Sequence, residues 1–225
     1  THSVSDFYEG KPMRVSFYRY SGDALGDIES YDVENSGLDL SNSSAWKALT
    51  KDAVLADPGA VLKTRTVYTG GKDEERIDRV FEYDSTGKNI KGVPVYEYEG
   101  DALRKTTAYR GAEEIAGAIR NLTIYTGTAG KEIADRTFRY VAGAVRTTTV
   151  FHYGEHNILT ESVEFRGEVK SAADEAGASK KTVTQFTGAG GEESAVHQIA
   201  FGYRRGRSMN GSITESRAAS FPFAS

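Results

Sequence analysis

The chain lacks cysteine and long apolar runs, and it contains little proline. Without cysteine there is no disulfide framework, no thiolate metal ligand and no cysteine nucleophile. The four prolines stand at positions 12, 58, 94 and 222. Because proline removes a donor from a β-ladder, the proline-free stretch 95–221 can form uninterrupted strands, whose edges then lack one protection against pairing. No segment approaches the roughly 18 apolar residues that a membrane-spanning helix requires, so no membrane span is expected.

The charge is nearly balanced, which argues against a nucleic-acid-binding protein of the ordinary basic kind. The 225 residues include 28 basic and 32 acidic side chains, and the net charge is −4. The two signs are mixed along the chain, without a basic stripe or a long acidic tail. We therefore expect no nucleic-acid partner. A nearly neutral surface also resists self-association less than a highly charged one.

The composition favours strands. Apolar residues make up 38% of the chain, against about 45–50% in an average globular protein. Aromatic side chains are plentiful, with 13 tyrosines and 10 phenylalanines but a single tryptophan. Tyrosine and threonine suit a pleated, half-wet surface. We therefore expect a thin core that is supplied largely by tyrosine and phenylalanine.

The chain begins with Thr1 rather than with methionine. This favours a mature protein from which a signal peptide has been removed, and hence a place outside the cell or on its surface. A sequence trimmed at its start is the alternative.

The most informative feature is an internal repeat. Tyr68-Thr69-Gly70 returns after 57 residues as Tyr125-Thr126-Gly127, and after 61 more as Phe186-Thr187-Gly188. Each copy closes on a Phe-x-Tyr element, and the first two carry an Asp-Arg pair before it. The closing elements are Phe81-x-Tyr83, Phe138-x-Tyr140 and Phe201-x-Tyr203. A unit of this length that recurs along a chain predicts a tandem architecture, because one unit cannot bury its own apolar face.

A second repeat indicates that hairpins of one design are reused. Tyr18-Arg19-Tyr20 followed by Gly22-Asp23-Ala24-Leu25 matches Tyr96-Glu97-Tyr98 followed by Gly100-Asp101-Ala102-Leu103. Glycine-containing turns separate short alternating runs throughout the chain. The strands that we expect cover residues 14–20, 63–69, 77–83, 93–99, 104–109, 121–126, 135–141, 145–153, 158–165, 181–186, 196–203 and 212–215.

These patterns predict a mainly β fold of antiparallel repeated hairpins, arranged as a meander, a sandwich or a solenoid. One short helix is expected near 44–56, after the capping residues 41–44 and before Pro58-Gly59. Three regions follow. Residues 1–62 form an arm (1–12), a hairpin and the helix; residues 63–215 form the repeated hairpins, with copies beginning near 64, 121 and 181; residues 216–225 form an aromatic tail.

The stretch Phe81-Glu82-Tyr83-Asp84-Ser85-Thr86-Gly87-Lys88 resembles the Tyr-Asp repeat of Rhs-type secreted bacterial surface proteins. A looser match is Tyr96-Glu97-Tyr98-Glu99-Gly100-Asp101-Ala102-Leu103, with Glu99 in the place of the aspartate. The resemblance implies an exported shell or fibre that is built from repeated hairpins, most of which carry no chemistry. The third copy departs from the pattern, since Arg204 follows Tyr203.

We find no constellation that predicts catalysis, a metal or a cofactor. His152 and His156 are four residues apart, but Tyr153-Gly154 between them favours a turn over the helix that a metal pair needs. Three paired acids occur near predicted turns, and we interpret them as solvated edge charges rather than as a glycosidase pair. They are Glu74-Glu75, Glu113-Glu114 and Glu192-Glu193. We expect a protein that is not an enzyme.

The ends of the chain carry the candidate assembly residues. Phe7 and Tyr8 lie near the start, and Phe221, Pro222 and Phe223 near the end. An aromatic tail folds back on its own sheet or enters a neighbouring subunit, and the second contact propagates head to tail into a homopolymer. The sequence therefore favours a subunit of an extracellular filament, tube or coat. The alternative is an adhesin or carbohydrate-binding module that uses exposed tyrosine faces to bind surface or matrix glycans.

Overall fold

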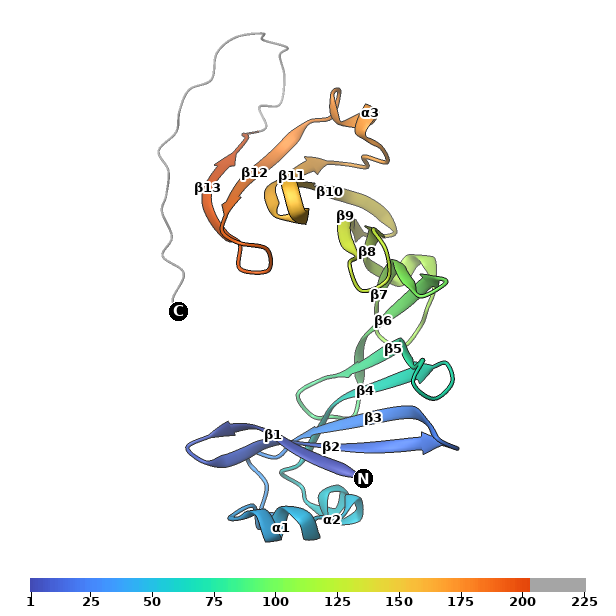
Figure 1. The fold of residues 1–225 in the computed structure, drawn as a ribbon, viewed down its shortest axis with the longest axis vertical. Helices are drawn as coiled ribbons and strands as arrows, with labels where there is room; N and C mark the ends of the chain where they lie inside the picture. Colours follow the sequence, from blue (N-terminus) through green and yellow to red (C-terminus); the bar gives the residue numbers. More distant parts are fainter. Residues whose placement is uncertain (203–225) are drawn as a thin grey trace. The chain divides into compact units, whose positions relative to one another are not determined.

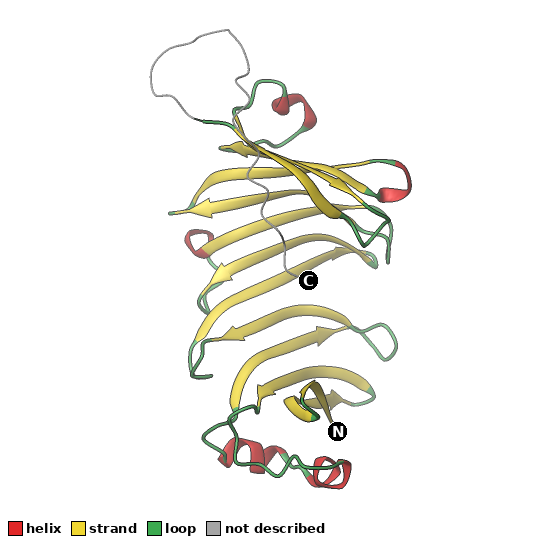
Figure 2. Cartoon of the chain, turned by 90° about the vertical axis from the view of Figure 1, so that its left-hand side faces the viewer, coloured by secondary structure: helices red, strands yellow, loops and turns green. Residues whose placement is uncertain are grey.

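The computed structural model describes residues 1–202 and contains two compact units, residues 1–120 and residues 121 onward. In both units the strands lie side by side in one layer (Figures 1 and 2). Unit 1 contains β1 (His2–Tyr8), β2 (Lys11–Ser21), β3 (Ala24–Asp32), β4 (Val61–Thr69), β5 (Arg76–Tyr83), β6 (Ile90–Glu99) and β7 (Ala102–Arg110). Unit 2 contains β8 (Ile119–Thr126), which begins at the boundary, and β9 (Ile133–Val141), β10 (Ala144–Tyr153), β11 (Leu159–Arg166), β12 (Lys180–Thr187) and β13 (Ser194–Ala200).

Every strand within a unit pairs antiparallel with the strands before and after it in the chain. The prediction of a mainly β, antiparallel hairpin fold is confirmed, and of the three expected arrangements the meander is the one found. One strand, β1, was not expected, and it occupies the predicted arm, where Val4 pairs with Val15. β3 is the second strand of the hairpin that was expected within residues 1–62. The predicted strand at 212–215 lies outside the described residues.

Helical residues stand where a helix was expected, near 44–56, but they form two short helices rather than one. α1 (Ser43–Ala48) is capped by Asn42, whose side chain accepts from the backbone N–H groups of Ser44 and Ala45. The chain then becomes extended, and Thr50 begins α2 (Lys51–Ala56) by accepting from Ala53 N at 3.2 Å. A second capping residue inside the run thus breaks it in two.

Three shorter turns of helix complete the described part of the chain. They are η1 (Ala116–Ala118), η2 (Glu155–Asn157) and α3 (Ala172–Glu175). Ser171 and Asp174 form a capping box at the start of α3. None of the helices in residues 1–202 is long and apolar enough to cross a membrane.

The buried core consists of two small clusters, and valine rather than the aromatic residues supplies most of it. In unit 1, α2, the C-cap of α1 and the segment before α1 pack on β2 and β3, around Val15, Tyr31, Val33 and Val54. In unit 2 the buried cluster is Val150, Val163, Phe165, Val169 and Val183. The expectation of a mainly aromatic core is therefore wrong. Most of the repeated tyrosines are only half-buried, since a single-layer sheet leaves both of its faces partly open.

The repeat has a structural cause, which is a β-bulge near the turn of each hairpin. In ten strand pairs of residues 1–202 the pairing shifts by one residue just before an aromatic side chain of the first strand, and one residue of the second strand is left unpaired. In the six hairpins whose first strand is even-numbered, the aromatic residues are Tyr20, Tyr68, Tyr98, Tyr125, Tyr153 and Phe186. The unpaired residues are Gly26, Asp78, Arg104, Asp135, Thr160 and Val196. The two sequence repeats are therefore alternating hairpins of one bulged design.

The cluster of unit 2 can be tested with Phe165→Ala, since Phe165 is 1% exposed at its centre. We expect the free energy of unfolding of unit 2 to fall by about 3–5 kcal/mol, the usual cost of emptying a buried phenylalanine site. Urea unfolding with hydrogen exchange on β10–β12 measures it. Val141→Ala is the control, because Val141 is 47% exposed, and it should change stability by no more than about 0.5 kcal/mol. Equal losses in both variants would contradict the assignment of this cluster as core.

Candidate binding surfaces

The turn acids of two repeats are tied to the backbone. Oε1 of Glu75 accepts a hydrogen bond from Leu25 N at 3.0 Å, and Oε1 of Glu193 accepts one from Leu159 N at 3.1 Å. Each bond links a hairpin turn to the first residues of a strand two places away in the sheet. The backbone donor Leu25 N lowers the pKa of Glu75 below the ordinary value, and the pKa of Glu193 is lowered by its own backbone N–H and then by Leu159 N. The interpretation of these two acids as merely solvated charges is therefore wrong.

The Asp-Arg pair of the first two copies is also explained by the bulge. Asp78 and Asp135 are the unpaired bulge residues, and each accepts from Nε of the following arginine at 2.6 Å. Arg79 additionally pairs with Glu114, so the acid pair 113–114 also holds a partner. The hydrogen bond that Arg79 donates to the carboxylate of Asp78 holds the pKa of Arg79 above its usual value.

One acid of unit 1 is buried between two arginines. Asp27 on β3 is 4% exposed and accepts hydrogen bonds from Arg19 and Arg65, the latter at 3.0 Å. Burial alone would raise the pKa of Asp27, but the hydrogen bonds from these two arginines outweigh it and leave the pKa below its ordinary value. The arrangement is a closed ion-pair network, and it cross-links β2, β3 and β4.

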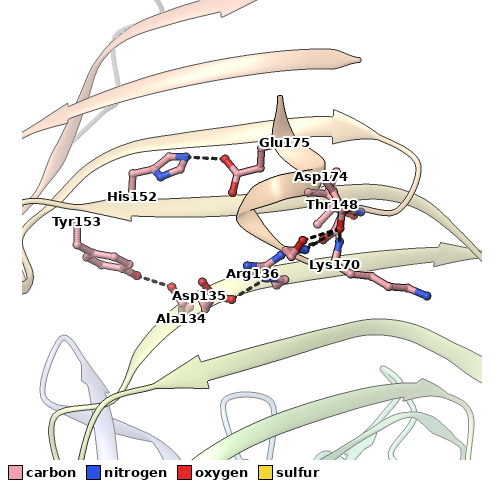
Figure 3. A network of polar contacts seen from close by, with 11 residues as sticks. Ala134, Asp135, Arg136, Thr148, His152, Tyr153, Lys170, Asp174 and Glu175 are labelled. Carbon is pink, nitrogen blue, oxygen red and sulfur yellow. Dashed lines mark hydrogen bonds and ion pairs between the residues drawn. The ribbon is translucent and has the colours of Figure 1, made fainter. Parts of the chain in front are cut away.

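In unit 2 a polar network holds the loop 167–179 on one face of the sheet (Figure 3). Arg136 is buried on β9 and donates from Nη1 to the carbonyl oxygen of Val169 at 3.2 Å. Oγ1 of Thr148 donates to Gly167 O at 2.8 Å and accepts from Val169 N at 3.0 Å. These contacts satisfy buried backbone groups of the loop and seat Val169 on the apolar cluster.

A hollow of about 640 Å³ lies beside this loop, on the same face. Nε2 of His152 stands 3.5 Å from Oε2 of Glu175, and Glu161 pairs with His152 across β10 and β11. Phe165, Ala178 and Lys180 also line the hollow. His152 lies on strand β10 and His156 in the short 3-10 turn η2, so the two do not share the α-helix that a metal pair at this spacing would need. Within residues 1–202 no three histidine, aspartate or glutamate side chains are grouped to hold a metal ion.

The opposite face of unit 2 carries a groove of about 650 Å³ with a very different lining. Its charged residues are all basic: Arg139, Arg146, Arg166 and Lys181. Thr147 forms part of the floor and is 5% exposed. The sequence did not predict this surface. Its members are up to 42 positions apart in the sequence, and only the register of the strands brings them together.

The predicted assembly residues lie at the edge of unit 1 or beyond the described part. Phe7 and Tyr8 end β1 and are 51% and 65% exposed. The ring of Phe7 packs against the ring of Trp46 on α1, with 5.3 Å between the two ring centroids. Phe221, Pro222 and Phe223 lie outside the described residues.

The Tyr-Asp turn is held by its own aspartate. Asp84 accepts from Thr86 N at 3.0 Å and from Asn89 Nδ2 at 2.8 Å. The side chains of Thr86 and Asn89 hold the pKa of Asp84 well below its usual range. Gly87 has φ +70°, and a Cβ there would come within 2.9 Å of Leu62 N. The aspartate and the glycine of this motif thus shape a turn.

A scan against protein-family models finds no matching family, and a search of curated proteins finds no matching sequence.

The tie between Glu75 and Leu25 predicts a pH-dependent stability. Glu75→Ala should lower the melting temperature of unit 1 at pH 7, because Leu25 N loses its acceptor. A carboxylate with a lowered pKa contributes stability above its unfolded pKa, near 4.5, and loses that contribution as the pH falls through its folded pKa. The difference from wild type should therefore shrink below about pH 4. Differential scanning calorimetry from pH 7 to pH 3 measures it.

Glu74→Ala is the matched control, since the neighbouring Glu74 is exposed and its side chain has no hydrogen bond or ion pair within residues 1–202. It should leave the melting temperature nearly unchanged at every pH. A Glu75→Ala effect that stays constant down to pH 3 would contradict a role for the charge.

Proposed function

We propose that this protein is a non-catalytic extracellular structural protein, a subunit that assembles head to tail into a filament, tube or coat. The observation that supports the proposal is the exposure of β13. All seven of its residues are exposed, and Val196 and Ile199 are 60% and 43% exposed. An exposed strand with apolar side chains is a template on which another strand can add.

The sequence of β13 lacks the usual protections of an edge. Ser-Ala-Val-His-Gln-Ile-Ala contains no proline, lysine, arginine or acid. Within residues 1–202, β13 pairs with β12 alone. Natural edge strands are commonly guarded by charge, proline or a bulge that turns the edge away. Strand β13 carries a bulge at Val196, but on the side that pairs with β12.

The matching surface on a second copy is β1, the edge strand of unit 1. It ends in the exposed Phe7 and Tyr8. A contact between β13 of one copy and β1 of the next uses two different surfaces, so it does not close on itself and continues into a polymer. Asp6 interrupts β1 with φ +53° and pairs with Arg14 at 2.9 Å. That interruption divides the β1 edge, with residues 2–5 before it and Phe7 and Tyr8 after it, and it favours a short, specific strand contact.

The extracellular location rests on the resemblance to Tyr-Asp repeat proteins. The alternative of a glycan-binding module that uses tyrosine faces has less support. Among the tyrosines of the described residues, only Tyr8 and Tyr20 are more than half exposed.

The proposal is tested by placing charge on the edge with the double variant Val196→Lys, Ile199→Lys. Both side chains are exposed, so the fold should be kept while pairing of β13 is opposed. We expect fibres of the wild-type protein in negative-stain electron microscopy, and a monomer of the double variant in sedimentation velocity. Circular dichroism and the melting temperature check that the variant is folded.

Ile115→Lys is the matched control, because Ile115 is 56% exposed and lies outside the strands. It should assemble as wild type does. The proposal fails if concentrated wild-type protein stays monomeric, or if the β13 variant forms the same fibres.

A further inference from the structure

The basic groove of unit 2 presents one cation on each of four consecutive strands. Arg139 lies on β9, Arg146 on β10, Arg166 on β11 and Lys181 on β12. Arg139 pairs with Thr147, which in turn pairs with Arg166. Neighbouring strands are about 4.7–4.9 Å apart. The strands that carry the four cations therefore follow one another across the sheet at about this spacing.

Two of these cations stand there because of bulges. Arg146 is the unpaired residue between Val145 and Thr147, and Lys181 is the unpaired residue between Lys180 and Thr182. A bulge re-aims the side chain next to it. Lys181 then bonds Glu164 at 2.8 Å, on the face opposite to the buried Val163 and Phe165. This is the face on which the groove opens.

The charge of the groove is only partly compensated. Lys181 is paired with Glu164, and Arg166 donates to the carbonyl oxygens of Lys180 and Phe201. The side chains of Arg139 and Arg146 take part in no hydrogen bond or ion pair within residues 1–202, and both residues are exposed. Two uncompensated arginines near two further cations repel one another, and a bound anion would relieve that repulsion.

The same face offers hydroxyl groups next to the cations. Strand alternation puts Thr149 on the face of Thr147, and the register continues from Thr149 to Thr137 on β9 and to Glu164 on β11. Half-buried hydroxyls of this face are carried by Thr137, Thr149, Ser162, Thr182 and Thr184. Each hydroxyl can donate one hydrogen bond and accept others, as the hydroxyl groups of a sugar do.

We propose that this groove binds a linear acidic glycan that runs across β9–β12. Its carboxylate or sulfate groups pair with Arg139 and Arg146, whose planar guanidinium groups suit bidentate contact with such anions. Its hydroxyl groups meet the threonine-rich face beside the groove. Nucleic acid is disfavoured as the occupant, because the chain has a net charge of −4 and the basic side chains are otherwise mixed with acids.

The repeat provides an internal comparison. Glu82 follows Phe81 in unit 1 as Arg139 follows Phe138 in unit 2. Lys91 is the unpaired bulge residue between β5 and β6, as Arg146 is between β9 and β10. Gly92 pairs with Arg110 as Thr147 pairs with Arg166. The corresponding place in unit 1 therefore holds one acid and two bases, and the acid Glu82 stands where unit 2 has Arg139.

The test is a titration of the full chain with polygalacturonate and with heparin, which carry carboxylate and sulfate groups. Neutral dextran and single-stranded DNA are the comparisons, and isothermal calorimetry is the measurement. The double variant Arg139→Gln, Arg146→Gln should bind at least one of the acidic glycans roughly tenfold or more weakly, since each arginine removes a charge-assisted bond. Wild-type affinity should fall as salt is raised. The melting temperature of the variant should not fall, because repulsion between the cations is reduced.

The double variant Lys63→Gln, Lys91→Gln is the matched control, because it removes two bulge cations of unit 1. It should bind the glycan as wild type does. The proposal is overturned if neither acidic glycan binds, if the two double variants lose affinity equally, or if DNA binds as tightly as the glycan. Neutral dextran that binds as well as the acidic polymers would also overturn it.

Discussion

The backbone ladder between consecutive strands is the interaction on which the rest of the structure depends. Two small clusters, around Val15 and around Phe165, are the only groups of fully buried apolar side chains in residues 1–202. Elsewhere each strand is held by its two neighbours and by cross-strand pairs, with both faces partly wet. Ties such as Glu75 to Leu25 therefore matter, since they join strands that are not adjacent.

Much of the strand pattern could be predicted, because alternation and glycine turns are local signals. β1 could not, because its pairing depends on partners such as Phe17 opposite His2, and an isolated run gives no sign of them. The prediction of one continuous helix was wrong at Thr50, because this residue caps a second helix inside an apparently continuous run. The prediction of a mainly aromatic core was wrong for another reason. Composition counts tyrosines, but only tertiary contacts decide that valines near the loop 167–179 and the helices are fully covered.

The surfaces were harder to predict than the strands. The constant offset of seven residues from Tyr68 to Glu75 and from Phe186 to Glu193 was a usable signal, and it marks a structural bond rather than a solvated charge. The basic groove left no such signal. Arg146 and Lys181 reach it through one-residue shifts of pairing that composition and spacing do not reveal. The net charge of the whole chain, −4, gives no sign of the local excess of positive charge in this groove.

The bulges separate the chemistry of a position from the geometry of the sheet. An unpaired residue belongs to no rung of the ladder, so replacing its side chain leaves the pairing of its neighbours in register. The unpaired residues of the strand pairs in residues 1–202 are already glycine, aspartate, arginine, threonine, valine and lysine. Such a sheet therefore offers, at regular intervals, positions whose side chains can be changed without a change in strand register. Substitution of the unpaired residue in each hairpin can therefore change the ligand that the surface binds, while the pairing of the strands stays the same.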